Sequence, residues 1–216
     1  MSALQYIADN WGTIGPEILT HLLIVAVCMA AATLVGVVLG ILSARNERFS
    51  AVALGTTSVL LTIPSFALFG LLTIWLGLGN PPVIVGLTLY ALLPVTRNTR
   101  AGILGVDPAV VEAARGMGMS GRQILTRVEL PLALPVVLAG IRQATVMVVA
   151  IATVGATVGA DDLGRPILSA VGRSTGSYER IIAGILPVAG MGILADAVIA
   201  LIERSLRRGR VSVSPA

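Results

Sequence analysis

Charged residues are scarce in this chain, and their scarcity excludes an ordinary water-soluble domain. They make up 12% of the sequence, whereas hydrophobic residues make up 56% and the mean hydropathy is +0.93. A soluble domain carries about a quarter charged residues. Lysine is absent, and the fifteen basic residues are all arginines, which except for Arg142 lie between long apolar stretches. This arrangement argues against a nucleic-acid partner and predicts a protein surrounded by membrane lipid.

Cysteine and histidine are nearly absent, which limits the chemistry that the chain can perform. The single Cys28 excludes an internal disulfide and a cysteine metal cluster. His21 adds too few ligands for a metal site. The sequence has no glycine-rich phosphate loop ending in Gly-Lys-Ser/Thr, so we expect no ATP and no other cofactor in this chain. The apolar stretches also lack a nucleophile–base pair, and we do not expect an enzyme.

Apolar runs divide the chain into five predicted membrane spans, since a crossing helix needs about 20 apolar residues. The turn signal Gly77-Leu-Gly-Asn-Pro-Pro82 separates the second span from the third, and Pro64 should kink the second. The predicted spans are residues 18–43, 51–76, 82–96, 132–160 and 181–202. We therefore expect an all-α membrane protein. Its single transmembrane domain, residues 18–205, would lie between an N-terminal segment, 1–17, and a tail, 206–216.

The distribution of arginine predicts how these spans are oriented, because cytoplasmic loops carry an excess of basic residues. The segments after spans one, three and five carry eleven arginines, whereas the other side carries only Arg165, Arg173 and Arg180. This asymmetry places the N-terminus and segment 1–17 outside the cell, and the C-terminus and the tail in the cytoplasm.

A polar insert, about residues 98–131, separates the third span from the fourth on the cytoplasmic side. Asp107-Pro108 is typical of a helix start, and Gly118 should end that helix. Ser120 and Gln123 have the spacing of a capping box that begins a second short helix. Much of the first helix is apolar. It would either lie on the membrane surface or dock in a groove of a cytosolic partner.

The insert resembles the EAA loop of bacterial ABC importer permeases. That loop has the pattern E-A-A, three residues, G, nine residues, I-x-L-P, and this chain departs from it only in Val128, where isoleucine is usual. The matching positions are Glu112, Ala113, Ala114, Gly118, Leu130 and Pro131. Residues 61–70, 92–99, 113–119 and 130–135 resemble the osmoprotectant subfamily, whose solutes are glycine betaine, carnitine or choline. The resemblance covers about residues 15–205.

The resemblance implies a type I ABC importer permease fold in the bacterial cytoplasmic (inner) membrane. Such a chain is half of a path that a second permease copy or a sister permease completes. A cytosolic ABC ATPase, which binds ATP and Mg²⁺, would dock on the EAA loop, and an extracytoplasmic solute-binding protein would deliver the solute. Alternatives are a permease for an amino acid or a thiol betaine, or an ATPase-independent secondary transporter or channel.

Two charges interrupt the predicted spans, and charges within a bilayer should face protein or water. Arg142 lies about ten residues, or roughly 15 Å, from the cytoplasmic start of span four, and Asp196 lies at a similar depth in span five. We predict that the two side chains approach one another or share a polar network. The alternative is that each reaches separately toward the cytoplasmic interface.

Several residues of spans two to four are candidates for the lining of a transport path. They are Pro64, Ser65, Phe66, Phe69, Tyr90, Thr145, Thr153 and Thr157. Threonines in a span suit either a polar wall or close helix packing, and a proline frees a backbone carbonyl. The eight aromatic residues are scattered, so they predict no complete cage for a quaternary ammonium ion. We therefore expect tight recognition to belong to the binding protein.

Two carboxylates begin the outer loop, residues 161–180. The osmoprotectant subfamily usually shows G-A-G-G-L-G there, whereas this chain has Asp161 and Asp162 in place of two glycines. The pair would attract a cationic solute or meet basic residues of the binding protein. The alternative is a solvated turn.

Overall fold

The computed structural model describes residues 3–171 and 177–208, and this part of the chain contains helices and no strand. The helices in order are α1 Ala3–Asp9, α2 Trp11–Arg45, α3 Glu47–Thr62, α4 Ser65–Leu76, α5 Asn80–Leu104, α6 Pro108–Gly116, α7 Gly121–Ile124, α8 Leu130–Ala152, α9 Gly164–Ala170 and α10 Ser177–Arg208. A π-helical turn, Leu125–Glu129, joins α7 to α8, and a 3₁₀ turn, Thr153–Val158, follows α8. The all-α prediction is confirmed.

The long helices correspond in order to the predicted spans, and most of them extend beyond the predicted bounds. Within the described residues, three stretches are long and apolar enough to cross a membrane by themselves, namely Trp11–Arg45, Gly121–Val158 and Tyr178–Ser205. The bent pair α3–α4 makes a fourth if it is one span. The remaining predicted span corresponds to α5, which does not meet this requirement because prolines, threonines and two arginines dilute its apolar residues.

The predicted kink at Pro64 is a full break in the helix. Helix α3 ends at Thr62, Ile63 and Pro64 are extended, and α4 leaves at an angle of 101°. Proline lacks the backbone N–H that a continuing helix needs, and it disfavours helical geometry in the residue before it. The predicted kink is therefore present, and it divides residues 51–76 into two helices.

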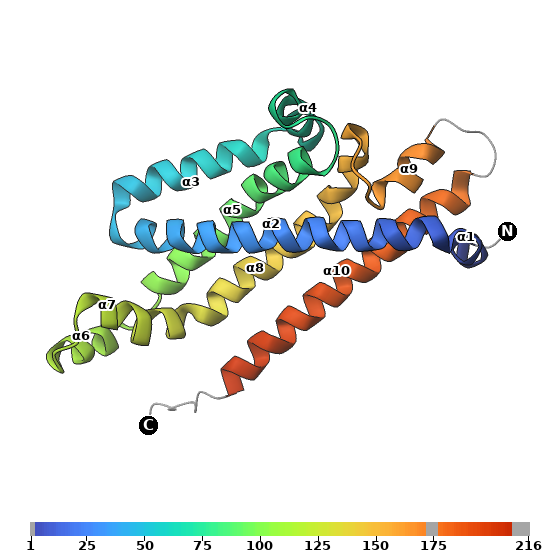
Figure 1. Cartoon of the computed structure of the whole chain (residues 1–216). Coiled ribbons are helices and arrows are strands. Elements are labelled where there is room, and N and C mark those ends of the chain that lie inside the picture. The colour runs from blue at the N-terminus through green and yellow to red at the C-terminus, as the bar shows by residue number, and fades with distance from the viewer. Residues whose placement is uncertain (1–2, 172–176, 209–216) are drawn as a thin grey trace.

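Helix α5 lies at the centre of the molecule, between α2 and α8 (Figure 1). Gly36 and Gly40 let α2 approach it closely, since a Cβ on Gly40 would stand 2.4 Å from the Cβ of Thr99. On the other side, a Cβ on Gly140 of α8 would lie 2.8 Å from the backbone oxygen of Pro94. Small residues at such contacts are typical of helix packing in membranes. Because protein surrounds α5, its composition need not suit lipid.

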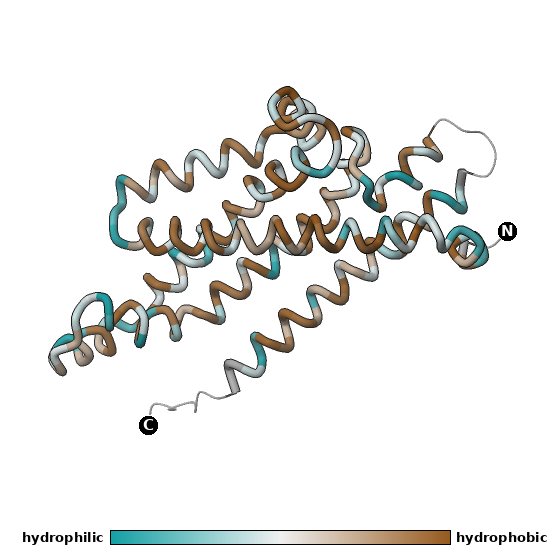
Figure 2. The backbone as a smooth tube through the Cα atoms, viewed as in Figure 1, coloured by the Kyte–Doolittle hydropathy of each residue, from teal (hydrophilic) through white to brown (hydrophobic). Residues whose placement is uncertain are grey.

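The polar segments gather at the two ends of the molecule, and the apolar helices run between them (Figure 2). Helices α6 and α7 lie at one end, which we call the loop end, together with the last turns of α10 (Figure 1). Helices α1 and α9 lie at the opposite end. Residues 172–176 of the predicted outer loop and 209–216 of the predicted tail lie outside the described residues.

Helix α10 packs along α8 and α9 but leaves most of its apolar surface uncovered by this chain. Ile193 is 72% exposed and Leu201 is 62% exposed. In a bilayer, such a surface faces lipid or another protein.

Candidate functional site

The loop between α5 and α8 folds as its sequence predicts at three positions. The Asp107 carboxylate caps α6 by accepting a hydrogen bond from the Ala109 N–H at 2.9 Å. Beyond the end of α6, Gly118 adopts φ +83°, a conformation that favours glycine. The Ser120 hydroxyl accepts from the Gln123 N–H at 3.4 Å, and the Gln123 side chain accepts from the Ser120 N–H at 2.8 Å. The capping box is confirmed.

The second loop helix is the start of a long rod, which the sequence did not predict. Helix α7, the π-helical turn, α8 and the 3₁₀ turn run without a break from Gly121 to Val158. Pro131 does not end the rod, and it follows directly after the π-helical turn, the kind of irregularity that accommodates a proline inside a helix. The second loop helix and α8 are therefore parts of one continuous helix.

The six residues that match the EAA pattern divide into an exposed group and a packed group. Glu112, Ala113 and Gly118 on the loop, with Pro131 at the start of α8, are exposed. Ala114 is 3% exposed, and its backbone oxygen accepts from the Met119 N–H at 3.2 Å. Leu130 is half-buried and packs against the small core at the root of the loop, which Ile103, Ala133 and Val137 form. The packed group holds the loop, and the exposed group offers a surface.

An ion pair fixes the root of the loop, and it was not predicted. Glu129 is 4% exposed and accepts two hydrogen bonds from the guanidinium of Arg45, at the end of α2. From the sequence, Arg45 served only to predict the orientation of the spans, and no role was predicted for Glu129. Nothing in the spacing of 84 residues signals this contact. It ties the loop to the helix that packs along α5.

The predicted encounter of Arg142 with Asp196 is confirmed. The guanidinium of Arg142 on α8 donates from Nε to Asp196 Oδ1 at 2.5 Å and from Nη2 to Oδ2 at 2.6 Å. This two-point contact joins α8 to α10. The alternative, in which each side chain reaches the interface separately, is wrong.

The candidate path residues of spans two to four do not all reach an exposed surface. Tyr90 is 2% exposed, and its hydroxyl donates to the Ile63 carbonyl at 2.6 Å, so it satisfies the backbone at the Pro64 break. Phe69 is fully buried, whereas Phe66 is 65% exposed and Pro64 is exposed. Their burial makes Tyr90 and Phe69 core residues, and it removes them from the candidate lining of a path.

Hydroxyl groups on the α8 rod are satisfied within their own helix. Thr145 is buried and donates to the Ile141 carbonyl at 2.8 Å. Thr153 and Thr157 donate to the carbonyls of Ala150 and Val154 at 2.8 and 2.7 Å. The 3₁₀ turn that carries these two threonines packs against α4, which begins at Ser65. Thr157 and the residues of the break therefore lie at the same end of the molecule.

The two carboxylates of the outer loop occupy different environments. Asp161 is exposed and pairs with Arg165 at 2.5 Å. Asp162 is fully buried, and its Oδ1 accepts from the Gly164 N–H at 2.7 Å. The predicted solvated turn is therefore wrong for Asp162, and so is a contact of its side chain with a solute or a partner at the surface.

The sequence profile of one protein family matches residues 36–208, most of the described helices and the whole EAA-like loop. The chain belongs to the binding-protein-dependent transport system inner membrane components. Relatives of this permease share its sequence nearly end to end. The glycine betaine/carnitine/choline transport system permease protein OpuCD of Bacillus subtilis (strain 168) is 40% identical over 93% of this chain and 87% of its own length. The osmoprotectant import permease protein OsmW of Salmonella typhimurium (strain LT2) is 38% identical over 91% of this chain and 93% of its own length.

Solved structures of ABC importers have the same fold as this permease. An inward-facing MetNI methionine ABC transporter aligns with 92% of this chain and 98% of its own at a TM-score of 0.80 and 20% identity. An amino acid ABC transporter solved with histidines aligns with 93% of this chain and covers 97% of the transporter's chain, at a TM-score of 0.77 and 19% identity. At this level of identity the similarity establishes the fold. The predicted type I ABC importer permease fold is confirmed.

The environment of Asp162 in this permease favours its protonated form. Burial raises the pKa of its carboxyl to about 7, the Gly164 N–H opposes the shift, and the negative charge of Glu17 adds to it. Arg165 and Asp161 also face this carboxyl, with smaller and opposite effects. Neither the Oδ2 atom of Asp162 nor the Oε2 atom of Glu17 has a hydrogen-bond partner in the described residues.

Replacing Asp162 with asparagine is expected to flatten the dependence of stability on pH. The folded protein holds the Asp162 proton more tightly than the unfolded chain does, so stability is greatest in acid and falls as pH rises from about 4 to about 7. The wild-type melting temperature in detergent should decrease between pH 5 and pH 8. The Asp162→Asn protein should lack most of this decrease, and Asp161→Asn, at the exposed neighbour, should keep it. Equal slopes in all three proteins would contradict the assignment.

Proposed function

We propose that this chain is the permease subunit of an ATP-driven, binding-protein-dependent importer of quaternary-ammonium osmoprotectants such as glycine betaine, carnitine or choline. The observation that carries the proposal is the 40% identity to the Bacillus subtilis OpuCD permease across 93% of the chain. The match extends over the membrane helices and the loop end together. The chain itself is a transport subunit, and we assign ATP and Mg²⁺ to a separate ATPase.

The proposal places the ATPase at the loop end. Helix α6 presents Glu112 and Ala113 to solvent, and Met117 beside them is 76% exposed. A capped helix with an exposed flexible apolar side chain suits a groove in a partner. Ala114 and Leu130, which are packed, hold this surface in a fixed position relative to the α8 rod.

The proposal orients the loop end toward the cytoplasm. The arginine asymmetry supports this orientation, as does the position of α6, α7 and the end of α10 at one end of the molecule (Figure 1). The N-terminal segment, α1 and α9 would then face outward, where a solute-binding protein would dock. The uncovered surface of α10 is available to lipid and to a second permease, either another copy or a sister chain.

Coupling would run from the ATPase through the loop to the membrane helices. Closure of two ATPases on ATP would shift α6, and the continuous rod from Gly121 to Val158 would carry the shift to Arg142. The Arg45–Glu129 pair would make α2 follow the root of the loop, since breaking it leaves a buried glutamate without its cation. The permease would thus alternate between inward and outward access without binding ATP itself.

Growth under salt stress tests the solute class. The permease, its ATPase and its binding protein are expressed in a bacterium that lacks osmoprotectant uptake, and growth in high salt is measured with each added solute. We expect rescue by glycine betaine, carnitine or choline, and none when the permease is omitted. Uptake of methionine or histidine without any of the three would favour an amino acid permease, and rescue without the ATPase would favour a secondary transporter or channel.

A further inference from the structure

We propose that the Arg142–Asp196 pair is a low-affinity binding site for a zwitterionic solute inside the membrane-spanning part of the permease. The solute carboxylate would bind the guanidinium of Arg142, and its quaternary ammonium group would lie against the carboxylate of Asp196. The inference rests on the proposed function and adds to it a site on this chain and a preference for zwitterions over simple cations.

The Arg142–Asp196 pair lies on a surface that this chain leaves open, and it is not buried between the two helices. The Arg142 side chain is 37% exposed and that of Asp196 is 39% exposed. Charges at membrane depth are costly unless they face protein or water, and they mark transport paths in many membrane proteins. Part of each side chain is therefore accessible on this chain to a small molecule.

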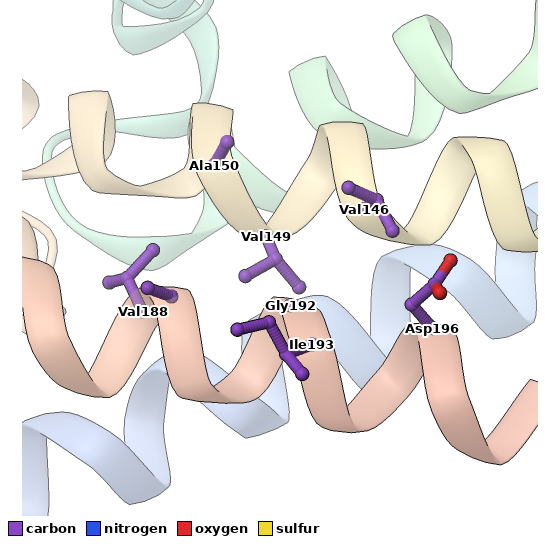
Figure 3. A pocket seen from close by; sticks show the side chains of 8 residues that line it. Val146, Val149, Ala150, Val188, Gly192, Ile193 and Asp196 are labelled. Atoms are coloured by element: carbon purple, nitrogen blue, oxygen red, sulfur yellow. The ribbon is translucent and has the colours of Figure 1, made fainter.

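Two grooves meet at Asp196, and Arg142 lines the second of them. One has a volume of about 420 Å³, lies between α8 and α10, and is walled by aliphatic side chains such as Val149 and Ile193, with Asp196 at its end (Figure 3). The other has a volume of about 470 Å³ and includes Arg142, Gln143 and Asp196. Gly192 lines the first groove, where a Cβ would meet only Val149, at 4.0 Å. Both volumes lie within the range of small-molecule sites.

The chemistry of the two side chains matches both charges of a betaine. A guanidinium binds a carboxylate through two parallel hydrogen bonds, the geometry that Arg142 already makes with Asp196. A zwitterion can therefore supply a carboxylate to Arg142 and a positive charge to Asp196, so that neither charge is left unpaired, although a quaternary ammonium donates no hydrogen bond to Asp196. A simple cation such as choline satisfies Asp196 but leaves Arg142 without a counter-charge, which is costly away from bulk water. The aliphatic walls suit the methyl groups of the ammonium.

The exchange also explains why the site would bind weakly. The solute must first displace an ion pair that is already formed, and the groove walls offer Val, Ala, Gly and Ile contacts in place of the aromatic faces that favour quaternary ammonium ions. Weak binding suits a path, because a solute that is held tightly would not leave on the other side.

Uptake by the complete complex, with ATPase and binding protein, in proteoliposomes provides the test. Labelled glycine betaine, a zwitterion, is compared with labelled choline, a cation. We expect Arg142→Gln to lower glycine betaine uptake about tenfold, as the loss of a charge-assisted hydrogen bond predicts, and to change choline uptake less than about twofold. Asp196→Asn should lower both. Glu47→Gln, which neutralises the acid of the exposed Glu47–Arg100 pair, is the matched control and should alter neither.

Arg142→Lys is a second variant that is expected to fold, because lysine keeps the positive charge that pairs with Asp196. It lacks only the bidentate hydrogen bonding of the guanidinium. It should lower the ratio of glycine betaine to choline uptake several-fold. A purely structural role changes both solutes alike, so an unchanged ratio in Arg142→Lys and Arg142→Gln would overturn the proposal. A wild-type complex that imports neither solute would instead refute the proposed function.

Direct binding gives a readout that does not depend on choline transport. Saturation-transfer NMR with glycine betaine is measured on the permease–ATPase complex in nanodiscs, without the binding protein. We expect a signal from the methyl groups in the wild type and its loss when Arg142→Gln and Asp196→Asn are combined, a change that leaves no lone charge. Equal signals in the two complexes, or none in the wild type, would refute the site.

Discussion

Exchanging Glu112 for arginine is expected to reduce ATP-driven uptake to background while the membrane helices stay folded. Glu112 is exposed in the middle of α6, so the change disturbs no internal packing. It reverses the charge and enlarges the side chain at the centre of the surface that we assign to the ATPase, so the fit between the two surfaces is lost. The amount of ATPase that co-purifies with the permease should fall more than about tenfold, as for a residue central to an interface.

A matched charge reversal at the other end of the molecule controls for nonspecific effects. Asp9 is exposed on α1, far along the chain from the loop end, and Asp9→Arg changes the net charge by the same amount. We expect normal recovery of the ATPase with this variant. Normal recovery and uptake with Glu112→Arg would remove α6 from the coupling surface.

Placing leucine at Gly40 is expected to destabilise the packing of the helices around α5. Even a Cβ there would stand 2.4 Å from the Cβ of Thr99 and 2.9 Å from the backbone oxygen of Thr96, so α2 and α5 must separate. Overpacking of a tight interface costs roughly 1–3 kcal/mol, and the larger side chain adds to this. The melting temperature of the purified permease should fall on the order of 5–10 °C.

Gly70 provides the control for this prediction. It lies on α4, where a Cβ would have open space around it within 4 Å. Gly70→Leu carries the same change in size and in helix propensity, and its melting temperature should stay near that of the wild type. Similar losses in both variants would show that propensity, and not the approach of α2 to α5, determines the effect.

Local signals in the sequence predicted the loop end well, because they act within a few residues. The Asp107 cap, the Ser120–Gln123 capping box and the positive φ of Gly118 are each decided by short-range hydrogen bonds or by backbone freedom. The Arg142–Asp196 pair was predictable for another reason. A charge at membrane depth requires a partner, and matching depths on two spans indicated which one.

Features that depend on the neighbours of a residue could not be predicted. The 101° turn at Pro64 requires Tyr90, from another helix, to satisfy the Ile63 carbonyl. The burial of Asp162 depends on its packing against Gly155, where a Cβ would stand 2.7 Å from Oδ2. The position of α5 inside the bundle is likewise invisible in its composition. Hydropathy reports how well a helix suits lipid, and a helix that other helices surround need not suit it.

The central claim is that this permease imports an osmoprotectant at the expense of ATP. Uptake of labelled glycine betaine into proteoliposomes tests it most directly, because the permease, its ATPase and its solute take part in one measurement. The complete complex is reconstituted with binding protein outside and ATP inside, and the same liposomes without ATP and without ATPase are compared. We expect accumulation against a gradient only when permease, ATPase, ATP and binding protein are all present. Accumulation by the permease alone, driven by an ion gradient, would contradict the account.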